Sequence, residues 1–192
     1  YGADPSISGA VRYEAGASYV VFGRRVTFSD RVIPDLSLNQ FAQGSAYGFS
    51  ILGAASGDVS GLRVSSAGDF NGDGVSDVIV GATYADESID NIDTGVAYVI
   101  FGHSGSFDQI DLLTMYSGPS TGLRIFGGES ASESMNILSG VGDVNGDGLA
   151  DLIVGAPQNG GSATGKSYVV YGTTGTPSIN LANVASGVGG FV

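Results

Sequence analysis

The stretch Gly-Asp-Phe-Asn-Gly-Asp-Gly-Val-Ser-Asp-Val-Ile-Val-Gly-Ala, residues 68–82, decides the fold. It returns 74 residues later as Gly-Asp-Val-Asn-Gly-Asp-Gly-Leu-Ala-Asp-Leu-Ile-Val-Gly-Ala, residues 142–156. The segment Gly-Ala-Ser-Tyr-Val-Val-Phe-Gly at 16–23 recurs in related form at 95–102 and 165–172. Several motifs that recur in one order at nearly one period identify a repeat protein.

Each repeat is predicted to hold four short strands, because glycine clusters separate apolar runs and no long segment has helical periodicity. The second run is almost continuously apolar, which is typical of a strand covered on both faces. The predicted strands are 62–67 and 136–141 (first), 77–81 and 151–155 (second), 97–101 and 167–171 (third), and 122–126 with its counterpart 48–52 (fourth).

Four-stranded antiparallel units placed side by side predict an all-β fold built from β-propeller blades, of which this chain holds a part. We expect a partial blade at 1–61 that begins at the end of its second strand, a complete blade at 62–127, and a nearly complete blade at 128–192 that stops in its last strand. Tyr19, Tyr98 and Tyr168 share one position of the repeat, so they are expected to pack in the core or between blades.

Composition excludes several classes of protein. Of the 192 residues, 42% are apolar and 14% are charged, which excludes intrinsic disorder. The formal net charge is -12 and Lys166 is the single lysine, so a nucleic-acid partner is not expected. No apolar run approaches the roughly 20 residues of a membrane span. Without cysteine there is neither a disulfide nor a thiolate metal site.

The repeated stretch places side-chain oxygens at positions 1, 3, 5 and 9 of a loop, which suits calcium because this ion takes about 6–8 oxygen ligands. A glycine at position 6 permits the positive φ that curls the chain round an ion, and the carbonyl at position 7 adds a ligand. Two copies with the same spacing favour calcium over plain acidic turns, the alternative interpretation. The predicted ligands of the two ions are Asp69, Asn71, Asp73, Val75 and Asp77, and Asp143, Asn145, Asp147, Leu149 and Asp151.

An EF-hand is excluded because its twelfth position needs a glutamate, whereas this chain has Val80 or Val154 there. Magnesium fits less well because it demands a strict octahedron and holds its water. Zinc fits poorly without histidine or cysteine ligands.

The run at 65–82 and its partner ending at Pro157 resemble FG-GAP repeats, the blades of the integrin α-subunit propeller. The resemblance covers nearly the whole chain and implies that the ten residues above form two calcium sites. It also implies a propeller of seven blades that serves adhesion or ligand binding. Thr83 departs from the proline that the repeat leads us to expect, and the lack of cysteine is more similar to secreted bacterial versions than to animal integrins.

The expected function is a non-catalytic calcium-binding propeller module of a secreted or cell-surface protein. Its partners would be a protein or glycan ligand and further FG-GAP blades of the parent chain. The alternative is the propeller part of a secreted polysaccharide lyase or hydrolase whose catalytic residues lie outside this chain. His103, the single histidine, is interpreted as a surface-turn residue rather than a member of a catalytic triad.

Overall fold

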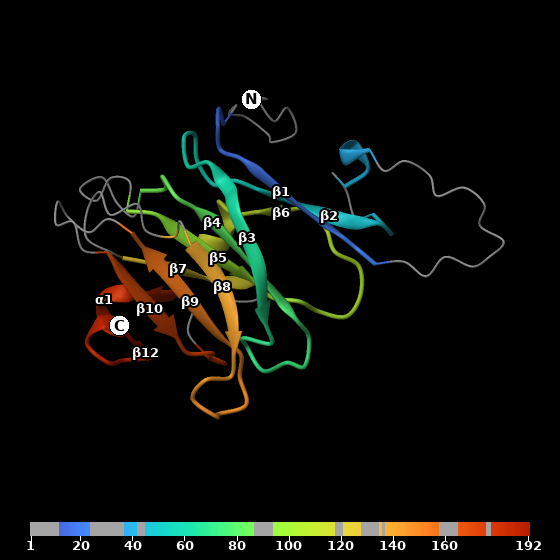
Figure 1. Ribbon diagram of the computed structural model, residues 1–192. Helices are drawn as coiled ribbons and strands as arrows, with labels where there is room; N and C mark the ends of the chain where they lie inside the picture. Colours follow the sequence, from blue (N-terminus) through green and yellow to red (C-terminus); the bar gives the residue numbers. More distant parts are fainter. Residues whose placement is uncertain are drawn as a thin grey trace.

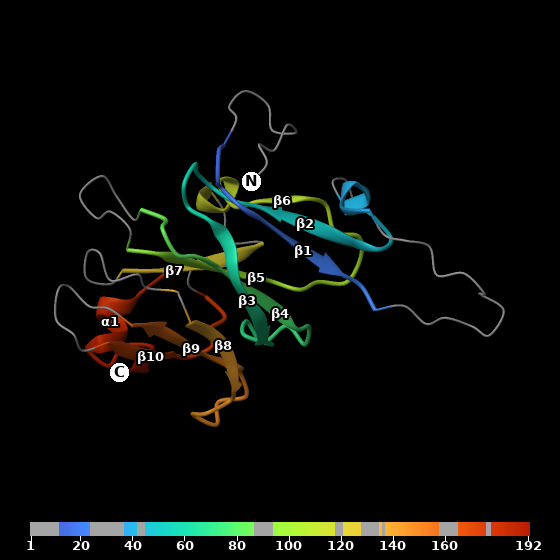
Figure 2. The ribbon, with the colours of Figure 1, turned by 45° about the horizontal axis from the view of Figure 1, so that its top comes forward.

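The structure, a computed structural model, describes residues 12–23, 37–41, 45–86, 94–117, 121–127, 135, 137–157, 165–175 and 178–192. These residues form three small sheets that lie side by side, each packed against the next (Figures 1 and 2). The predicted all-β class and the antiparallel sheets of propeller-type repeats are confirmed. In the described ranges, no helix has the length and apolar character that crossing a bilayer requires.

The strands follow the glycine-bounded runs of the sequence to within two residues wherever a strand was predicted. The described strands are β1 (Ala17–Val21), β2 (Gly48–Leu52), β3 (Ser60–Gly68), β4 (Asp77–Ala82), β5 (Val96–Ile100), β6 (Ile110–Asp111), β7 (Gly122–Phe126), β8 (Ile137–Gly142), β9 (Asp151–Ala156), β10 (Lys166–Val170), β11 (Ser178–Asn180) and β12 (Gly190–Phe191). The helical elements are η1 (Leu38–Phe41), η2 (Thr114–Ser117) and α1 (Leu181–Ala185).

The first sheet has the order β1-β2-β6, the second β11-β7-β5-β4-β3, and the third β12-β10-β9-β8. In the second sheet, the strands β3, β4, β5 and β7 form the antiparallel meander that the repeat predicts. The third sheet repeats this order with β8, β9, β10 and β12. The division of the chain into blades stays a prediction, and the expected strand end at residues 1–4 lies outside the described residues.

Two short parallel strands, which the sequence analysis did not predict, are added to the antiparallel sheets. The short strand β6 pairs in parallel with β2 of the preceding unit, and β11 pairs in parallel with β7 in the same way. Each ends immediately before a leucine, Leu112 or Leu181, whose side chain is fully buried. Burial of this leucine holds the short strand against the edge of the preceding unit's sheet, at β2 or β7. Each added strand therefore connects two consecutive units.

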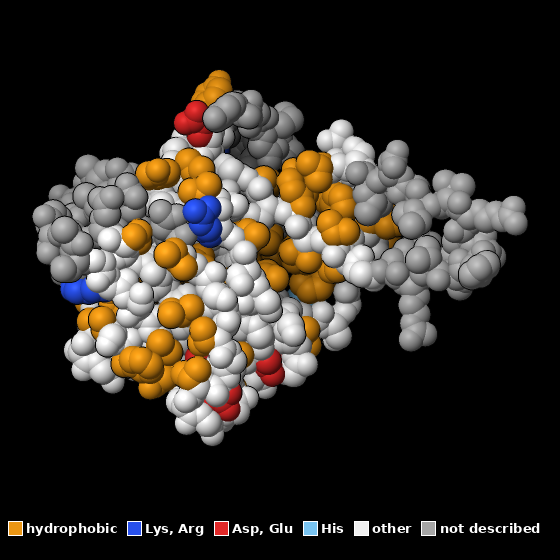
Figure 3. Space-filling model, viewed as in Figure 1, with side chains coloured by type: hydrophobic (Ala, Val, Ile, Leu, Met, Phe, Trp, Pro, Cys, Tyr) orange, Lys and Arg blue, Asp and Glu red, His pale blue; other side chains and the backbone are white. Residues whose placement is uncertain are grey.

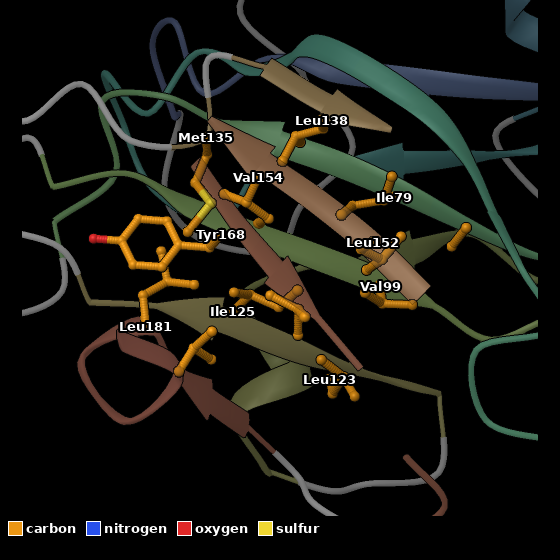
Figure 4. Close-up of a cluster of buried hydrophobic side chains, with 14 of the residues drawn as sticks. Ile79, Val99, Leu123, Ile125, Met135, Leu138, Leu152, Val154, Tyr168 and Leu181 are labelled. Carbon is orange, nitrogen blue, oxygen red and sulfur yellow. The ribbon is translucent and has the colours of Figure 1, made fainter. Parts of the chain in front are cut away.

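Two hydrophobic clusters fill the spaces between the sheets. One lies between the first and second sheets and includes Phe49, Ile51, Val80 and Tyr98. The other lies between the second and third sheets, where side chains of β4, β5 and β7 meet those of β8, β9 and β10 (Figure 4). Residues of β4 belong to both clusters, so both faces of this strand are covered, which explains its almost continuously apolar sequence.

The repeated tyrosine has two environments. Tyr98 and Tyr168 are 0% and 4% exposed, which confirms the predicted packing role for these two positions. Tyr19 is 40% exposed, and its ring meets Phe41 edge-on with centroids 6.0 Å apart. No sheet in the described part of the chain covers this side of β1, so for Tyr19 the expectation of burial is wrong.

Candidate metal centre

The two aspartate loops occupy equivalent places in consecutive sheets. One connects β3 to β4 and the other connects β8 to β9, and both project from the same end of their hairpins (Figure 1). Gly74 and Gly148 have φ values of 86° and 92°, which confirms the left-handed turn predicted at position 6 of each loop. Only glycine adopts this conformation without strain, so the turn explains its presence at both positions.

Each loop is organised around the carboxylate at its first position. The carboxylate of Asp69 accepts hydrogen bonds from the backbone N–H groups of Gly72 (2.8 Å), Asp73 (3.0 Å) and Gly74 (2.9 Å). In the second loop, Asp143 accepts the corresponding bonds at 2.7, 3.1 and 2.8 Å. These bonds lower the pKa of Asp143, the bond from Gly148 contributing most, so this carboxylate stays ionised at neutral pH.

The third and fifth positions of each loop are joined to one another. The side-chain amide of Asn71 donates to Asp73 at 2.9 Å and its oxygen accepts from the backbone N–H of Asp73, also at 2.9 Å. Asn145 and Asp147 repeat both bonds at 2.8 and 2.9 Å. The oxygens at positions 1, 3 and 5 therefore lie on one curled segment in both loops.

The aspartate at the ninth position has different surroundings, because it is buried. Asp77 is 1% exposed; its Oδ2 accepts from the backbone N–H of Phe70 at 2.9 Å and its Oδ1 accepts from that of Gly102 at 2.8 Å. Asp151 is fully buried and makes the same pair of bonds with Val144 (2.8 Å) and Gly172 (2.9 Å). The carboxylate thus fastens its own loop to the end of the third strand.

Burial dominates the electrostatics of Asp77. Desolvation raises its pKa, the bonds from Gly102 and Phe70 oppose this rise, and the negative charge of Asp73 adds to it. No loop aspartate forms an ion pair with lysine or arginine in the part of the chain that is described. Within that part, no three acidic or histidine side chains by themselves converge closely enough to enclose an ion.

The first loop also contacts the second. The carbonyl oxygens of Asp69 and Phe70 accept hydrogen bonds from the backbone N–H groups of Ala150 and Thr173, both at 2.9 Å. Phe70 is fully buried, whereas its counterpart Val144 is 51% exposed. A following unit therefore supports the first loop, and no described residue supports the second in this way.

Sequence reasoning missed the partners of the ninth-position carboxylate. Gly102 and Gly172 end the Tyr-Val-(Val/Ile)-(Phe/Tyr)-Gly motif, so the repeat marked them, but their contact with the loop depends on the folded hairpin. His103 is exposed as predicted, and its ring stacks on Phe107 with centroids 3.9 Å apart. Its Nδ1 lies 3.3 Å from the backbone carbonyl oxygen of Ser104.

The fold and the paired loops define the class of this protein: side-by-side β-sheet repeats of the propeller type, two of which have an aspartate loop between their first two strands. The FG-GAP repeat matches residues 60–100 and 138–170. The chain therefore contains FG-GAP repeats, as the resemblance predicts, and each matched range runs from the first strand of a unit through its aspartate loop to the third strand.

The chain is also similar to integrin α subunits. It is 28% identical over 168 residues to integrin alpha-7 of Rattus norvegicus, covering 88% of this chain and 12% of the rat protein. The match to integrin alpha-7 of Homo sapiens is 28% identical over 189 residues, covering 96% of this chain and 13% of the human protein. Integrin alpha pat-2 of Caenorhabditis elegans is 35% identical over 115 residues, covering 60% of this chain and 9% of the worm protein. The chain spans 9–13% of these relatives, and the expected likeness to secreted bacterial versions stays a prediction.

Proposed function

We propose that this chain is part of a non-catalytic, calcium-binding β-propeller. The propeller belongs to a secreted or cell-surface protein and serves adhesion. The observation that carries the proposal is the near identity of the two loops. Each loop contains six internal hydrogen bonds that have an equivalent in the other loop, and the lengths of equivalent bonds differ by 0.1 Å or less. Two unrelated acidic turns have no physical reason to agree so closely.

The donor set fits calcium rather than a softer metal. Asp69, Asn71, Asp73, Asp77 and the carbonyl of Val75 supply oxygen only, and Asp143, Asn145, Asp147, Asp151 and the carbonyl of Leu149 do the same. The ion would offset the repulsion among three carboxylates that have no lysine or arginine partner in the described residues.

The similarity to integrin α subunits supports adhesion as the wider role. In this proposal a protein or glycan ligand binds the assembled propeller, and further FG-GAP repeats of the parent protein complete it. Extracellular calcium modules bind with dissociation constants of about 10⁻⁴–10⁻³ M, which matches a location where calcium is millimolar.

Isothermal titration calorimetry of the chain with calcium tests the proposal. We expect two sites in the wild-type chain, one in Asp73→Ala or Asp147→Ala, and none in the double variant. Asp108→Ala is the matched control, because Asp108 is an exposed carboxylate outside both loops. Absence of heat at millimolar calcium, or binding that survives in the double variant, would refute the assigned ligands.

A further inference from the structure

Both aspartate loops contain an asparagine followed directly by a glycine, Asn71-Gly72 and Asn145-Gly146. Such a pair is chemically unstable, because the backbone nitrogen of the glycine can attack the side-chain carbonyl carbon of the asparagine and close a five-membered ring. Asparagine is a thermolabile residue, and glycine has no Cβ that would obstruct the closure. Whether the reaction occurs in the folded chain depends on the contacts of the two residues.

In the second loop, each group that ring closure changes has a hydrogen-bond partner. The N–H of Gly146, the attacking group, donates to Oδ1 of Asp143 at 2.7 Å. Oδ1 of Asn145 gains negative charge during the attack, and it accepts from the backbone N–H of Asp147 at 2.9 Å. Nδ2 of Asn145, the leaving nitrogen, donates to Oδ2 of Asp147 at 2.8 Å. These bonds hold the side chain of Asn145 against the backbone that follows it, next to the attacking nitrogen.

The same pair is open to solvent. Asn145, Gly146 and the residue on either side of them are exposed. Both loops project from the same end of their hairpins (Figure 1), where acidic side chains lie at the surface of the molecule (Figure 3). Apart from its chain neighbours, no described atom lies within 4 Å of the point where a Cβ of Gly146 would be. The peptide between the two residues therefore has room to rotate, and water can reach the ring.

The first loop makes the same internal bonds but is packed against the following unit. A Cβ at Gly72 would lie 2.6 Å from Cδ2 of Leu149 and 3.6 Å from Cγ2 of Thr174, and Asn71 is half-buried. The carbonyl groups of the two residues before Asn71 accept hydrogen bonds from the backbone of that unit. These contacts oppose rotation of the Gly72 peptide, so ring closure at Asn71 should be slower than at Asn145.

We propose that Asn145 is a modification site, at which the folded, calcium-free chain converts this asparagine into isoaspartate and aspartate without an enzyme. The nitrogen of Gly146 forms a bond to Cγ of Asn145 while the Cγ–Nδ2 bond breaks, and the proton of Gly146 leaves with Nδ2 as ammonia. Water then opens the imide: its OH adds to one of the two imide carbonyl carbons, and its other hydrogen returns to the Gly146 nitrogen. Opening at Cγ gives aspartate, and opening at the backbone carbonyl carbon gives isoaspartate.

Conversion changes the third position of the loop. Both products add a negative charge, and isoaspartate also lengthens the backbone by one methylene group, so the oxygens at positions 1, 3 and 5 lose the spacing that the first loop keeps. The expected effect of calcium rests on the function proposed above. An ion held by Asp143, Asn145 and Asp147 would fix the three groups that ring closure changes, and would therefore slow the conversion.

Peptide mapping by mass spectrometry, after incubation of the chain in EDTA at neutral pH and physiological temperature, tests the site. We expect the mass gain of an amide that becomes an acid at Asn145, and conversion at least fivefold slower at Asn71. This mass gain separates the reaction from isomerisation of Asp147, which leaves the mass unchanged. Asn183 is the internal control, because it is exposed but is followed by valine. An Asn145 that stays unconverted, or that converts no faster than Asn71, would overturn the proposal.

Incubation in concentrated urea shows whether the fold causes the difference. The unfolded chain has lost the contacts of both loops, so Asn71 and Asn145 should convert at equal rates there. A preference for Asn145 that is as large in urea as in the folded chain would overturn the structural argument.

One pair of variants tests the packing of the first loop. Leu149→Ala removes the side chain that lies against Gly72 and should raise conversion at Asn71 at least threefold. Val75→Ala is the matched control, because Val75 has the same loop position but its side chain lies beside Gly102. An unchanged rate at Asn71 in Leu149→Ala would contradict protection by the following unit.

A parallel incubation in millimolar calcium separates this proposal from that of calcium binding. We expect conversion at Asn145 to be at least fivefold slower than in EDTA. Conversion that is equal in the two media would count against the calcium sites, but it would still support Asn145 as the modification site. The failure of one proposal is therefore distinguishable from the failure of the other.

Discussion

Asp77 and Gly102 are joined by a hydrogen bond of 2.8 Å from the backbone N–H of the glycine to Oδ1 of the aspartate, across 25 residues of sequence. Asp151 and Gly172 repeat the relationship at 2.9 Å. The ninth position of each aspartate loop therefore has a structural role in addition to any role as an ion ligand. It fixes the distance between the loop and the third strand.

Removal of this carboxylate should destabilise the fold even without calcium. Asp77→Ala leaves the N–H groups of Phe70 and Gly102 without their acceptor, and one unsatisfied buried donor costs about 1–3 kcal/mol. We expect a loss of about 2–4 kcal/mol in the free energy of unfolding, measured by urea denaturation in EDTA. Asp77→Asn keeps one acceptor oxygen and should lose less, and the exposed Asp108→Ala should change little.

A second prediction concerns the two glycines of this contact, Gly102 and Gly172, because the surrounding backbone leaves no room for a side chain at either position. A Cβ at Gly102 would overlap the carbonyl oxygen of Ser76, and a Cβ at Gly172 would lie 2.7 Å from that of Ala150. Gly102→Ala and Gly172→Ala should each cost about 1–3 kcal/mol in thermal or urea unfolding. Gly23 ends the same motif in the first unit, and no atom of the described residues lies within 4 Å of the point where its Cβ would be. Gly23→Ala is therefore the matched control, and an equal loss there would contradict the steric explanation.

The main features of the fold could be predicted from the sequence because each of them is local. Glycine-bounded apolar runs marked the strands of the meanders, and the spacing of Asp69, Asn71 and Asp73 marked a loop with its turn at Gly74. The buried Asp77 was placed in that loop, but its hydrogen bond to Gly102 could not be predicted, since the two residues meet only when the third strand has folded onto the second.

The short strands β6 and β11 were missed for a different reason. They are only two and three residues long and pair with the preceding unit, so neither alternation nor length marks them. A weak signal does exist, because Ile-Asp-Leu at 110–112 and Ile-Asn-Leu at 179–181 are related. In both, the Asp or Asn side chain accepts from the backbone N–H two residues later, at 3.0 and 2.8 Å, so the resemblance extends to the turn that follows the strand.

Calcium should stabilise the folded chain. An ion that binds only the folded state adds about 1–2 kcal/mol per site at roughly ten times its dissociation constant. We expect the melting temperature to rise with millimolar calcium and to return to its starting value in EDTA. The double variant Asp73→Ala, Asp147→Ala should show no rise, whereas Asp108→Ala should respond as the wild type does. A rise of equal size with magnesium would contradict the assignment of the loops to calcium.

The ion pair between Arg12 and Asp111 should stabilise the contact between the first and second units. The guanidinium of Arg12 donates to the two carboxylate oxygens at 2.8 and 2.9 Å and to Gly53 O at 2.6 Å. The two side chains are 10% and 23% exposed, so water screens the pair only in part. A double-mutant cycle with Arg12→Ala and Asp111→Ala should give a coupling of about 1–2 kcal/mol in urea unfolding. Arg12→Lys should recover little of it, because lysine cannot make the paired contact.

Asp58 should make stability depend on pH in the direction opposite to that of most carboxylates. Burial raises its pKa from 3.8 to about 6; the negative charge of Asp86 adds to the rise, whereas the bond from Ala55 N–H and the charge of Arg12 oppose it. The folded state therefore binds more protons than the unfolded state between about pH 4 and pH 6, and this contribution to stability falls as pH rises through that window.

Asp58→Asn isolates this effect, because asparagine keeps an acceptor for the N–H of Ala55 and cannot ionise. We expect the variant to be more stable than the wild type at pH 7.5 by about 1 kcal/mol, once solvent screening of the carboxylate is included. At about pH 4 the two proteins should differ little, because the wild-type carboxyl is protonated in the folded state. Urea unfolding at both pH values measures the difference, with the exposed Asp108→Asn as control. A gain for Asp58→Asn that is equal at both pH values would show that packing, and not the buried charge, is responsible.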